Sequence, residues 1–351
     1  MCPIVSAGDD QAPPSSATIS RRRVWLAGAM AVGFSGCRRA REDAASPGAI
    51  TFSAPTDEQV SRHQSDWRSL FADLQQVTGL RVKPFFSPND ATLLAAMKYR
   101  RVDAGWFSNQ AALAAVRSAN GEVFARTLPA GEPRRATLIA RAGGATLEAV
   151  RRCDHKLSYG AGPANSMAGE LAPIAFFLGP EKLDPRRCFR QVTTADLDAN
   201  LRAVADGKLD VAASDTALLA SASGAAPSSL ANVTAIWTSP PLPQDPIIWR
   251  RDLDPDAKER LRQFFITYAR GEGALAERQR AALAPLDVGG FEVADNNHLL
   301  LAREMEARER LALAEWSGDA ARTQAARRAV DSVTAERQAF EDRVRAQAGT
   351  Q

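Results

Sequence analysis

The chain has 351 residues, of which 45% are hydrophobic and 24% are charged, a composition typical of a soluble globular protein. Its formal net charge is only +3, and no dense basic face is interleaved with aromatic residues, so nucleic acid is not an expected partner. A chain of this length can bury a substantial core, which favours two lobes.

The first residues predict an export signal and no part of the fold. Three arginines at 21–23 precede an apolar run from Val24 to Phe34. Such a run is too short to span a bilayer as a mature helix and is typical of a signal-peptide core. The segment "SRRRVWL" is also similar to the twin-arginine export signal. We therefore expect a signal peptide over 1–36 and a protein exported to the periplasm.

The segment "FSGC", which ends at Cys37, resembles a bacterial lipobox, where signal peptidase cuts before a cysteine that is then lipidated. Phe34 stands where leucine is usual, so type I cleavage without lipidation stays open. We expect a lipoprotein held at the membrane through Cys37, with a flexible tether over 37–48.

Two further cysteines, Cys153 and Cys188, would meet an oxidising compartment after export. A disulfide between them would close a loop of about 35 residues and stabilise the fold by roughly 3 to 4 kcal/mol. Two separate buried thiols are the alternative, because a sequence does not fix their geometry. The disulfide is favoured.

From residue 49 onward, short apolar strands alternate with amphipathic helices. The first half predicts strands over 49–55, 80–86 and 102–108, and helices over 67–77, 90–99 and 109–119. Two strands follow over 122–128 and 136–142, and the segment 129–135 between them resembles a hairpin turn.

A second alternation starts near Thr146. It predicts helices over 147–152, 166–178, 196–207 and 216–223, and strands over 156–162, 188–194, 209–215, 232–238 and 246–252. From about Pro255 the chain is expected to be helical. The pattern favours two doubly wound α/β lobes with mostly parallel sheets, joined by two crossovers. We expect lobe one over 49–139 plus 236–300, lobe two over 140–235 and a helical extension over 301–351.

The extension is rich in Ala, Arg and Glu and carries a thin apolar seam of Val330, Val333, Phe340 and Val344. A partner-binding coiled coil is one interpretation, but three heptads are barely met. A solvated helix, or a helical hairpin packed on its own lobe, is favoured.

Catalytic and metal-binding patterns are weak. The three histidines, His63, His155 and His298, are scattered, and none has metal-ligand spacing to another His, Cys or Glu. The chain has no G-x-S-x-G elbow and no P-loop lysine. We expect no enzyme activity, no metal and no cofactor.

The segment "GPANSMAG", residues 162–169, follows an expected strand and opens an expected helix. Ligands bind at the carboxyl ends of strands in such sheets, where unpaired amides of a helix N-terminus can hold an anion. Asn165 is a suitable N-cap and Ser166 adds a hydroxyl. A plain capped helix is the alternative that this local pattern leaves open.

The order of several segments resembles the phosphate/phosphite/phosphonate substrate-binding family of ABC importers. "GKLDVAASDTALL" is similar to the family's Gly-x-x-Asp-x-Ala-Ala-x-Asp segment, and "SPPLPQDPIIWRRDLDP" is similar to its return strand. "DATLLAAMKYRRVDAGWFSNQAALAA" is similar to its run of helix, strand and helix. The resemblance covers about residues 49 to 290 and implies a periplasmic-binding-protein-like fold.

The sequence departs from this family at its ligand clamp. The Ser-Thr-Ser-Gly clamp reads Ser166, Met167, Ala168 and Gly169, so two hydroxyls are lost while the backbone amides remain. Ala91 and Ala112 stand where the family has tyrosines. Ser108 and Asn109 replace Gly-Pro. These departures put the binding of an aminoalkyl phosphonate in doubt.

The resemblance implies that a phosphonate, phosphite or phosphate is enclosed between the lobes and passed to an ABC permease. It implies that Asn165 and Ser166, with the amides of the rest of the clamp, bind the oxygens. Asp90 and Asp215 would accept from a protonated oxygen or amine, with helix N-capping as their alternative role. Opposite-lobe candidates are Ser53, Ser108 and Asn109. A sensor domain on the same scaffold, without transport, is the alternative function.

Overall fold

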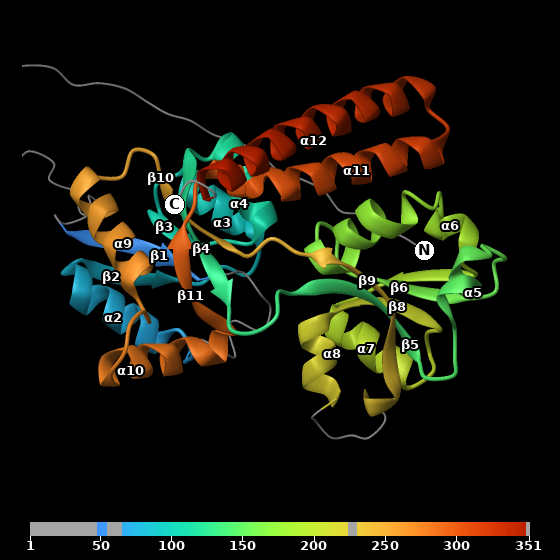
Figure 1. Cartoon of the computed structure of the whole chain (residues 1–351), viewed down its shortest axis with the longest axis horizontal. Coiled ribbons are helices and arrows are strands. Elements are labelled where there is room, and N and C mark those ends of the chain that lie inside the picture. The colour runs from blue at the N-terminus through green and yellow to red at the C-terminus, as the bar shows by residue number, and fades with distance from the viewer. Residues whose placement is uncertain (1–47, 55–64, 224–229, 349–351) are drawn as a thin grey trace, which may run out of the picture. The chain divides into compact units, whose positions relative to one another are not determined.

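The computed structural model describes residues 48–54, 65–223 and 230–348 (Figure 1). The expected signal peptide and Cys37 lie outside these residues. Within them, the strands form two sheets, each covered by helices. This arrangement confirms the expected fold class of two α/β lobes. The expectation of mostly parallel sheets is wrong, because five of the nine described strand pairs are antiparallel. None of the helices in the described part of the chain is long and apolar enough to cross a membrane.

The sheet of lobe one has the strand order β11-β4-β10-β3-β1-β2. Its strands are β1 (Ala49–Ser53), β2 (Arg81–Phe85), β3 (Ala104–Trp106), β4 (Gly121–Pro129), β10 (Pro246–Arg250) and β11 (Val288–Val293). Strand β1 lies parallel to β2 and β3, whereas β10 and β11 run antiparallel to their neighbours. The carboxyl ends of β1 and β3 therefore meet at one edge of the sheet.

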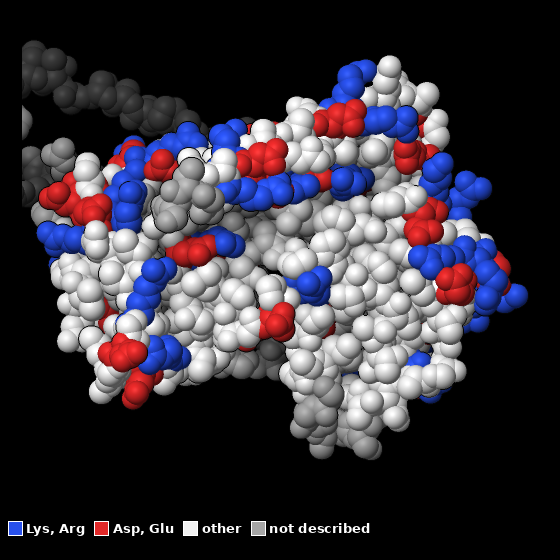
Figure 2. Space-filling view, viewed as in Figure 1, with Lys and Arg blue, Asp and Glu red and all other residues white. Residues whose placement is uncertain are grey.

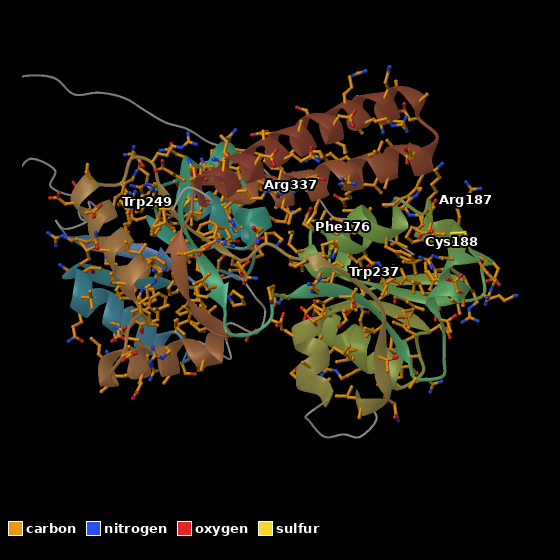
Figure 3. All side chains as sticks on the ribbon, viewed as in Figure 1. Phe176, Arg187, Cys188, Trp237, Trp249 and Arg337 are labelled. Carbon is orange, nitrogen blue, oxygen red and sulfur yellow. A yellow bond between two sulfur atoms is a disulfide. The ribbon has the colours of Figure 1, made fainter. Side chains whose placement is uncertain are left out.

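Helices cover both faces of this sheet. One face packs against α2 (Arg68–Thr78), α9 (Pro255–Thr267) and α10 (Ala274–Leu283), and the other against α3 (Asp90–Lys98) and α4 (Asn109–Ser118). Aromatic rings fill the first interface. Phe52 stacks on Phe265 at 5.6 Å between ring centroids. Phe124 stacks at 3.9 Å on Trp249, which is labelled in Figure 3. These large buried rings fix the sheet on which the lobe-one site residues stand.

The sheet of lobe two has the strand order β7-β6-β8-β5-β9. Its strands are β5 (Arg135–Arg141), β6 (Ser158–Ala161), β7 (Gln191–Thr194), β8 (Val211–Asp215) and β9 (Val233–Pro241). Its helical segments are α5 (Leu147–Arg151), η1 (Met167–Leu171), η2 (Ile174–Leu178), α6 (Pro185–Cys188), α7 (Leu197–Ala205), α8 (Thr216–Ser223) and η3 (Leu230–Asn232). Strands β6, β7 and β8 are parallel, so their carboxyl ends share one edge.

The chain passes between the lobes at 130–134 and 242–245, and this corrects two expectations. The segment 129–135 is not a hairpin turn, because β4 and β5 lie in different sheets. Strand β4 already pairs with β10 and β11 on its two edges, which leaves no edge for β5. The expected lobe bounds at 139 and 236 are also wrong, because β5 and β9 pair with each other from Arg135↔Pro241 to Arg141↔Val233.

The region after Pro255 is not wholly helical. After the short η4 (Ala284–Leu286), strand β11 pairs antiparallel with β4, and η5 (Asn296–Leu299) follows it. The segment "VGGFEV" has two glycines, which weaken a strand pattern in the sequence. Pairing with the open edge of β4 and burial of Phe291 stabilise a strand here that local propensity does not predict.

Cys153 and Cys188 form a disulfide in the structure, with an S–S distance of 1.97 Å (Figure 3). Cys153 follows α5 and has a positive φ of 48°, while Cys188 ends α6 and is buried in the lobe-two core. The backbone N–H of His155 donates to the carbonyl of Cys188 at 3.0 Å. The bridge therefore ties two short helices at one end of lobe two.

The C-terminal extension is a helical hairpin of α11 (Leu300–Ser317) and α12 (Ala320–Ala348), which lie side by side (Figure 1). The expectation that it packs on one lobe is wrong, since α11 contacts both. Ala302 joins the lobe-one core around α4, and Ala312 joins the lobe-two core. Arg117 of α4 also binds Glu306 of α11 at 2.8 Å. The helix is thus a third link between the lobes.

Rows of opposite charges run along this hairpin (Figure 2). Glu304 is buried and accepts from Arg308 and Arg337, and Arg303 binds Glu336 at 3.0 Å. The pairs Glu304–Arg337 and Arg303–Glu336 join α11 to α12. The apolar seam joins them as well, because Val330, Val333 and Phe340 pack with Leu300 and Ala307 of α11. Val344 of that seam is exposed, whereas Val333 is buried.

The disulfide should contribute measurably to the stability of lobe two. Reducing the Cys153–Cys188 bridge should lower the free energy of unfolding by roughly 3 to 4 kcal/mol, because the closed loop restricts the unfolded chain. Urea unfolding with and without reductant measures this difference. A Cys153→Ser variant is the control, since its stability should not respond to reductant. An equal response of parent and variant would contradict the bridge.

The carboxyl of Glu309 on α11 should make the free energy of unfolding depend on pH. Burial raises the pKa of its carboxyl from 4.5 to about 7, the negative charges of Glu170 and Glu306 add to this, and Arg310 opposes it. The folded state therefore keeps a proton that the unfolded chain has lost, so this group's contribution to stability falls as pH rises from about 4.5 to 7. A Glu309→Gln variant should be more stable than the parent at pH 8 and differ less at pH 5.

Urea unfolding at the two pH values tests this expectation. The control is Glu277→Gln on the exposed face of α10, which makes the same substitution away from the hairpin and should not reproduce the gain in stability at pH 8. A Glu309→Gln variant that tracks the parent at both pH values would show that the carboxyl is not protonated in the folded state.

Candidate functional site

The segment 162–169 lies directly after β6 and leads into η1. Ser166 is the N-cap residue, and its Oγ accepts from the amide of Gly169 at 3.1 Å. Asn165 has a positive φ of 64°, so it is the turn residue before the cap and not the cap itself. The segment is therefore a capped helix start, which agrees with both interpretations of it. The amides of Met167 and Ala168 make no hydrogen bond within the described residues.

Two glycines determine the shape of this segment. The amide of Gly162 donates to the carbonyl of Gly169 at 2.9 Å. A Cβ at Gly162 would lie 2.4 Å from the Cα of Gly169, and a Cβ at Gly169 would lie 2.6 Å from the Cα of Gly162. No side chain fits between two backbones at this distance, so both positions require glycine.

The helix that follows has a wide first turn. The amides of Glu170 and Leu171 both donate to the carbonyl of Ser166 at 3.0 Å, the second across five residues. Such π-type turns are rare and occur often at functional sites. The carboxylate of Glu170 reaches back and accepts from the amide of Asn165. This carboxylate therefore helps to fix the turn.

Lobe one presents a second helix N-terminus, at α4 after the carboxyl end of β3. Ser108 is its N-cap, accepting from the amide of Ala111 at 3.1 Å while its hydroxyl donates to Asp90 at 3.1 Å. The amides of Asn109 and Gln110 make no hydrogen bond within the described residues. This end of α4 thus has two amides available to an anion.

The side chain of Asn109 is buried and fixes α4 to the second crossover. Its Nδ2 donates to the carbonyls of Pro243 and Gln244 at 3.1 and 3.2 Å. Because both partners are carbonyl oxygens, the side-chain amide atom that faces them must be the nitrogen. Its Oδ1 is buried and has no partner among the described residues. The side chain therefore acts chiefly as a structural link at the site.

The two helix N-termini come together through the side chains of Gln110 and Met167. The Nε2 of Gln110 lies 3.7 Å from the Sδ of Met167. Gln110 is in the first turn of α4, and Met167 is the first residue of η1. The pairs of unbonded amides in the two lobes therefore belong to helix starts that contact each other.

Charged groups gather where the chain crosses between the lobes. Asp215, the last residue of β8, accepts from the amide of Leu218 at 2.8 Å and lies 3.7 Å from the Nε of Arg134. Asp215 thus caps the start of α8, which is the alternative role expected for it. Asp245 accepts from the indole of Trp106 at 3.2 Å. Burial raises the pKa of the Asp245 carboxyl and the charge of Asp90 adds to it, while Arg134 and the indole oppose them.

The remaining site candidates, Asp90 and Ser53, and the two positions where the family has tyrosine lie at different points of lobe one. Asp90 is not an N-cap, because the neighbouring Asn89 caps α3 by accepting from the amide of Thr92 at 2.9 Å. Ser53 ends β1, is fully buried, and donates to the carbonyl of Ala54 at 2.8 Å. Of the two tyrosine positions, Ala91 is exposed on α3, but Ala112 is buried inside α4 and lies in no loop.

Sequence reasoning missed Gln110, Arg134, Asp245 and Trp106. Their contacts depend on how the crossovers pass the two sheets, and no local pattern marks them. The described residues contain no group of three or more His, Cys, Asp or Glu side chains placed to hold a metal ion.

A model of the family described as "ABC transporter, phosphonate, periplasmic substrate-binding protein" matches residues 52–299. The phosphonates-binding periplasmic protein of Escherichia coli (strain K12) is 28% identical over 263 residues, which cover 74% of this chain and 78% of that protein. The match to the family model ends just before α11 begins.

Solved structures agree with this likeness. The binding protein component of an ABC phosphonate transporter from Pseudomonas aeruginosa superposes with a TM-score of 0.70 at 29% identity, covering 86% of this chain and 99% of that one. A protein from Prochlorococcus marinus (MIT 9301), solved with methylphosphonate, has the same fold, with a TM-score of 0.62 at 15% identity over 74% of this chain and 97% of its own. The chain therefore belongs to the family of periplasmic substrate-binding proteins of phosphonate ABC transporters.

Proposed function

We propose that this protein captures a phosphonate, phosphite or phosphate between its two lobes and delivers it to an ABC permease. The observation that carries the proposal is the meeting of two helix starts, one from each lobe, each with two amides that have no partner among the described residues. Helix N-termini bind phosphorus oxyanions through such amides and through the positive end of the helix dipole.

In this proposal the amides of Met167 and Ala168 bind oxygens from the lobe-two side, and those of Asn109 and Gln110 bind from lobe one. Ser166 adds a donor, because its Oγ accepts from Gly169 and its own hydrogen is left to donate. Asn165 and Gly169 shape the turn that presents these groups. The site thus depends on backbone donors that survive the loss of two clamp hydroxyls.

Acidic groups would act on the protonated part of the ligand. Asp90 and Asp215 would accept from a protonated oxygen or amine. The contact of Asp90 with Ser108 and that of Asp215 with Arg134 support this role. Ser108 would contribute its hydroxyl from lobe one. Ser53 would hold the end of β1 through its hydrogen bond to the carbonyl of Ala54. Hinge closure about the crossovers would then enclose the ligand.

We also propose that the protein is exported and held at the membrane by a lipid on Cys37. The basic start, the short apolar run and the "FSGC" segment support this proposal. A tether over 37–48 would give the lobes reach toward a permease.

Ser166→Ala tests the anion site. The variant should bind its oxyanion about ten- to a hundredfold more weakly, because it loses one hydrogen bond to a charged oxygen. Calorimetric titration with phosphate, phosphite and methylphosphonate measures the affinity.

The same substitution also removes a helix cap, and Thr146→Ala is the matched control for that loss. Thr146 caps α5 of the same lobe by accepting from the amide of Ala149 at 3.2 Å. Both variants should lower the melting temperature, but Thr146→Ala should keep the parent's affinity. If Ser166→Ala also keeps it, the segment is only a capped turn. Gly169 is no useful probe, since any side chain there would disrupt the turn.

Cys37→Ala should move the protein from the membrane fraction to uncleaved precursor or soluble protein, because lipidation needs the cysteine thiol. Cell fractionation and labelling with a radioactive fatty acid measure this change. Cys2→Ala, within the expected signal peptide, is the control and should leave fractionation unchanged. Membrane retention and label in Cys37→Ala would rule out a lipid at this residue.

A further inference from the structure

We propose that Met167, together with Gln110, limits the ligand to a compact oxyanion whose substituent on phosphorus is small. This inference rests on the proposed function and adds to it the class of ligand. It makes Met167 a selectivity residue, placed where the resembling family carries a small hydroxyl side chain.

The first observation is the packing of Met167. Its side chain packs against the apolar cluster of lobe one that contains Phe107 and Ala111, and also against the lobe-two cluster that contains Ala168 and Leu171. A single flexible side chain therefore lies against the cores of both lobes at the start of η1. Methionine suits such a place, because its unbranched chain adapts to irregular gaps.

The second observation is the contact with Gln110. The thioether sulfur lies 3.7 Å from the Gln110 Nε2, and both residues carry amides that are unbonded within the described part of the chain. A ligand that accepts hydrogen bonds from the amides of both helix starts must fit beside the contact of Met167 with Gln110. Because the Met167 side chain packs on both lobes beside these amides, a long substituent on phosphorus would have to displace it.

The experiment compares the affinities of methylphosphonate and 2-aminoethylphosphonate by calorimetry in the parent and in Met167→Ala. The parent should prefer methylphosphonate. Met167→Ala should shift the ratio of the two affinities by about tenfold or more toward the larger ligand, since excluding one or a few extra heavy atoms is worth roughly 10- to 200-fold. Gln110→Ala, on the opposite lobe, should shift the ratio in the same direction. This variant replaces Met167→Ala in the test if Met167→Ala does not fold.

Val116→Ala is the control, because Val116 packs against the same lobe-one cluster but near the other end of α4. Its ratio of the affinities for the two phosphonates should equal that of the parent. If the parent binds one of the phosphonates and neither Met167→Ala nor Gln110→Ala shifts the ratio, the inference is overturned and the proposed function stands. If the parent binds no phosphorus oxyanion at all, the proposed function fails and the inference fails with it.

Discussion

The site depends on one constraint: the two crossovers leave lobe one as hydrogen-bonded neighbours, β4 and β10, and enter lobe two as hydrogen-bonded neighbours, β5 and β9. The register is fixed on both sides, at Arg126↔Pro246 and at Arg135↔Pro241. Only 130–134 and 242–245 lie between the paired strands. Any rotation of one lobe against the other must be absorbed there, where Arg134 and Asp245 lie, and in the contacts that α11 makes with both lobes.

Much of the fold follows from the sequence because the alternation of strand and helix patterns is strong. The order of elements, the two lobes and the helical extension are all readable from it. The errors arise where a local pattern is ambiguous about its partner. Strands β4 and β5 look like a hairpin, and only the occupied edges of β4 show that β5 belongs elsewhere. Strand β11 forms because that same strand offers an edge to a glycine-rich segment.

The candidate site is less predictable, for a physical reason. Helix N-termini can be read from capping residues, so Ser108 and Ser166 are visible in the sequence. The sequence did not distinguish Asn89 from Asp90 as the cap of α3, because both are good caps one residue apart. Groups such as Arg134, whose role depends on the distance between two lobes, carry no local signature at all.

The position of α11 changes what the end of the family match means. Met305 is buried among Ala168, Leu171 and Ala175, on the underside of the helix that starts at the candidate anion site. A Cβ at Gly179 would lie 3.1 Å from the Cβ of Ala312, so η2 and α11 are in close contact. A chain shortened at residue 299 would retain the matched region but expose this apolar underside to water. We therefore expect a chain without the hairpin to aggregate, because the hairpin covers this surface in the full protein.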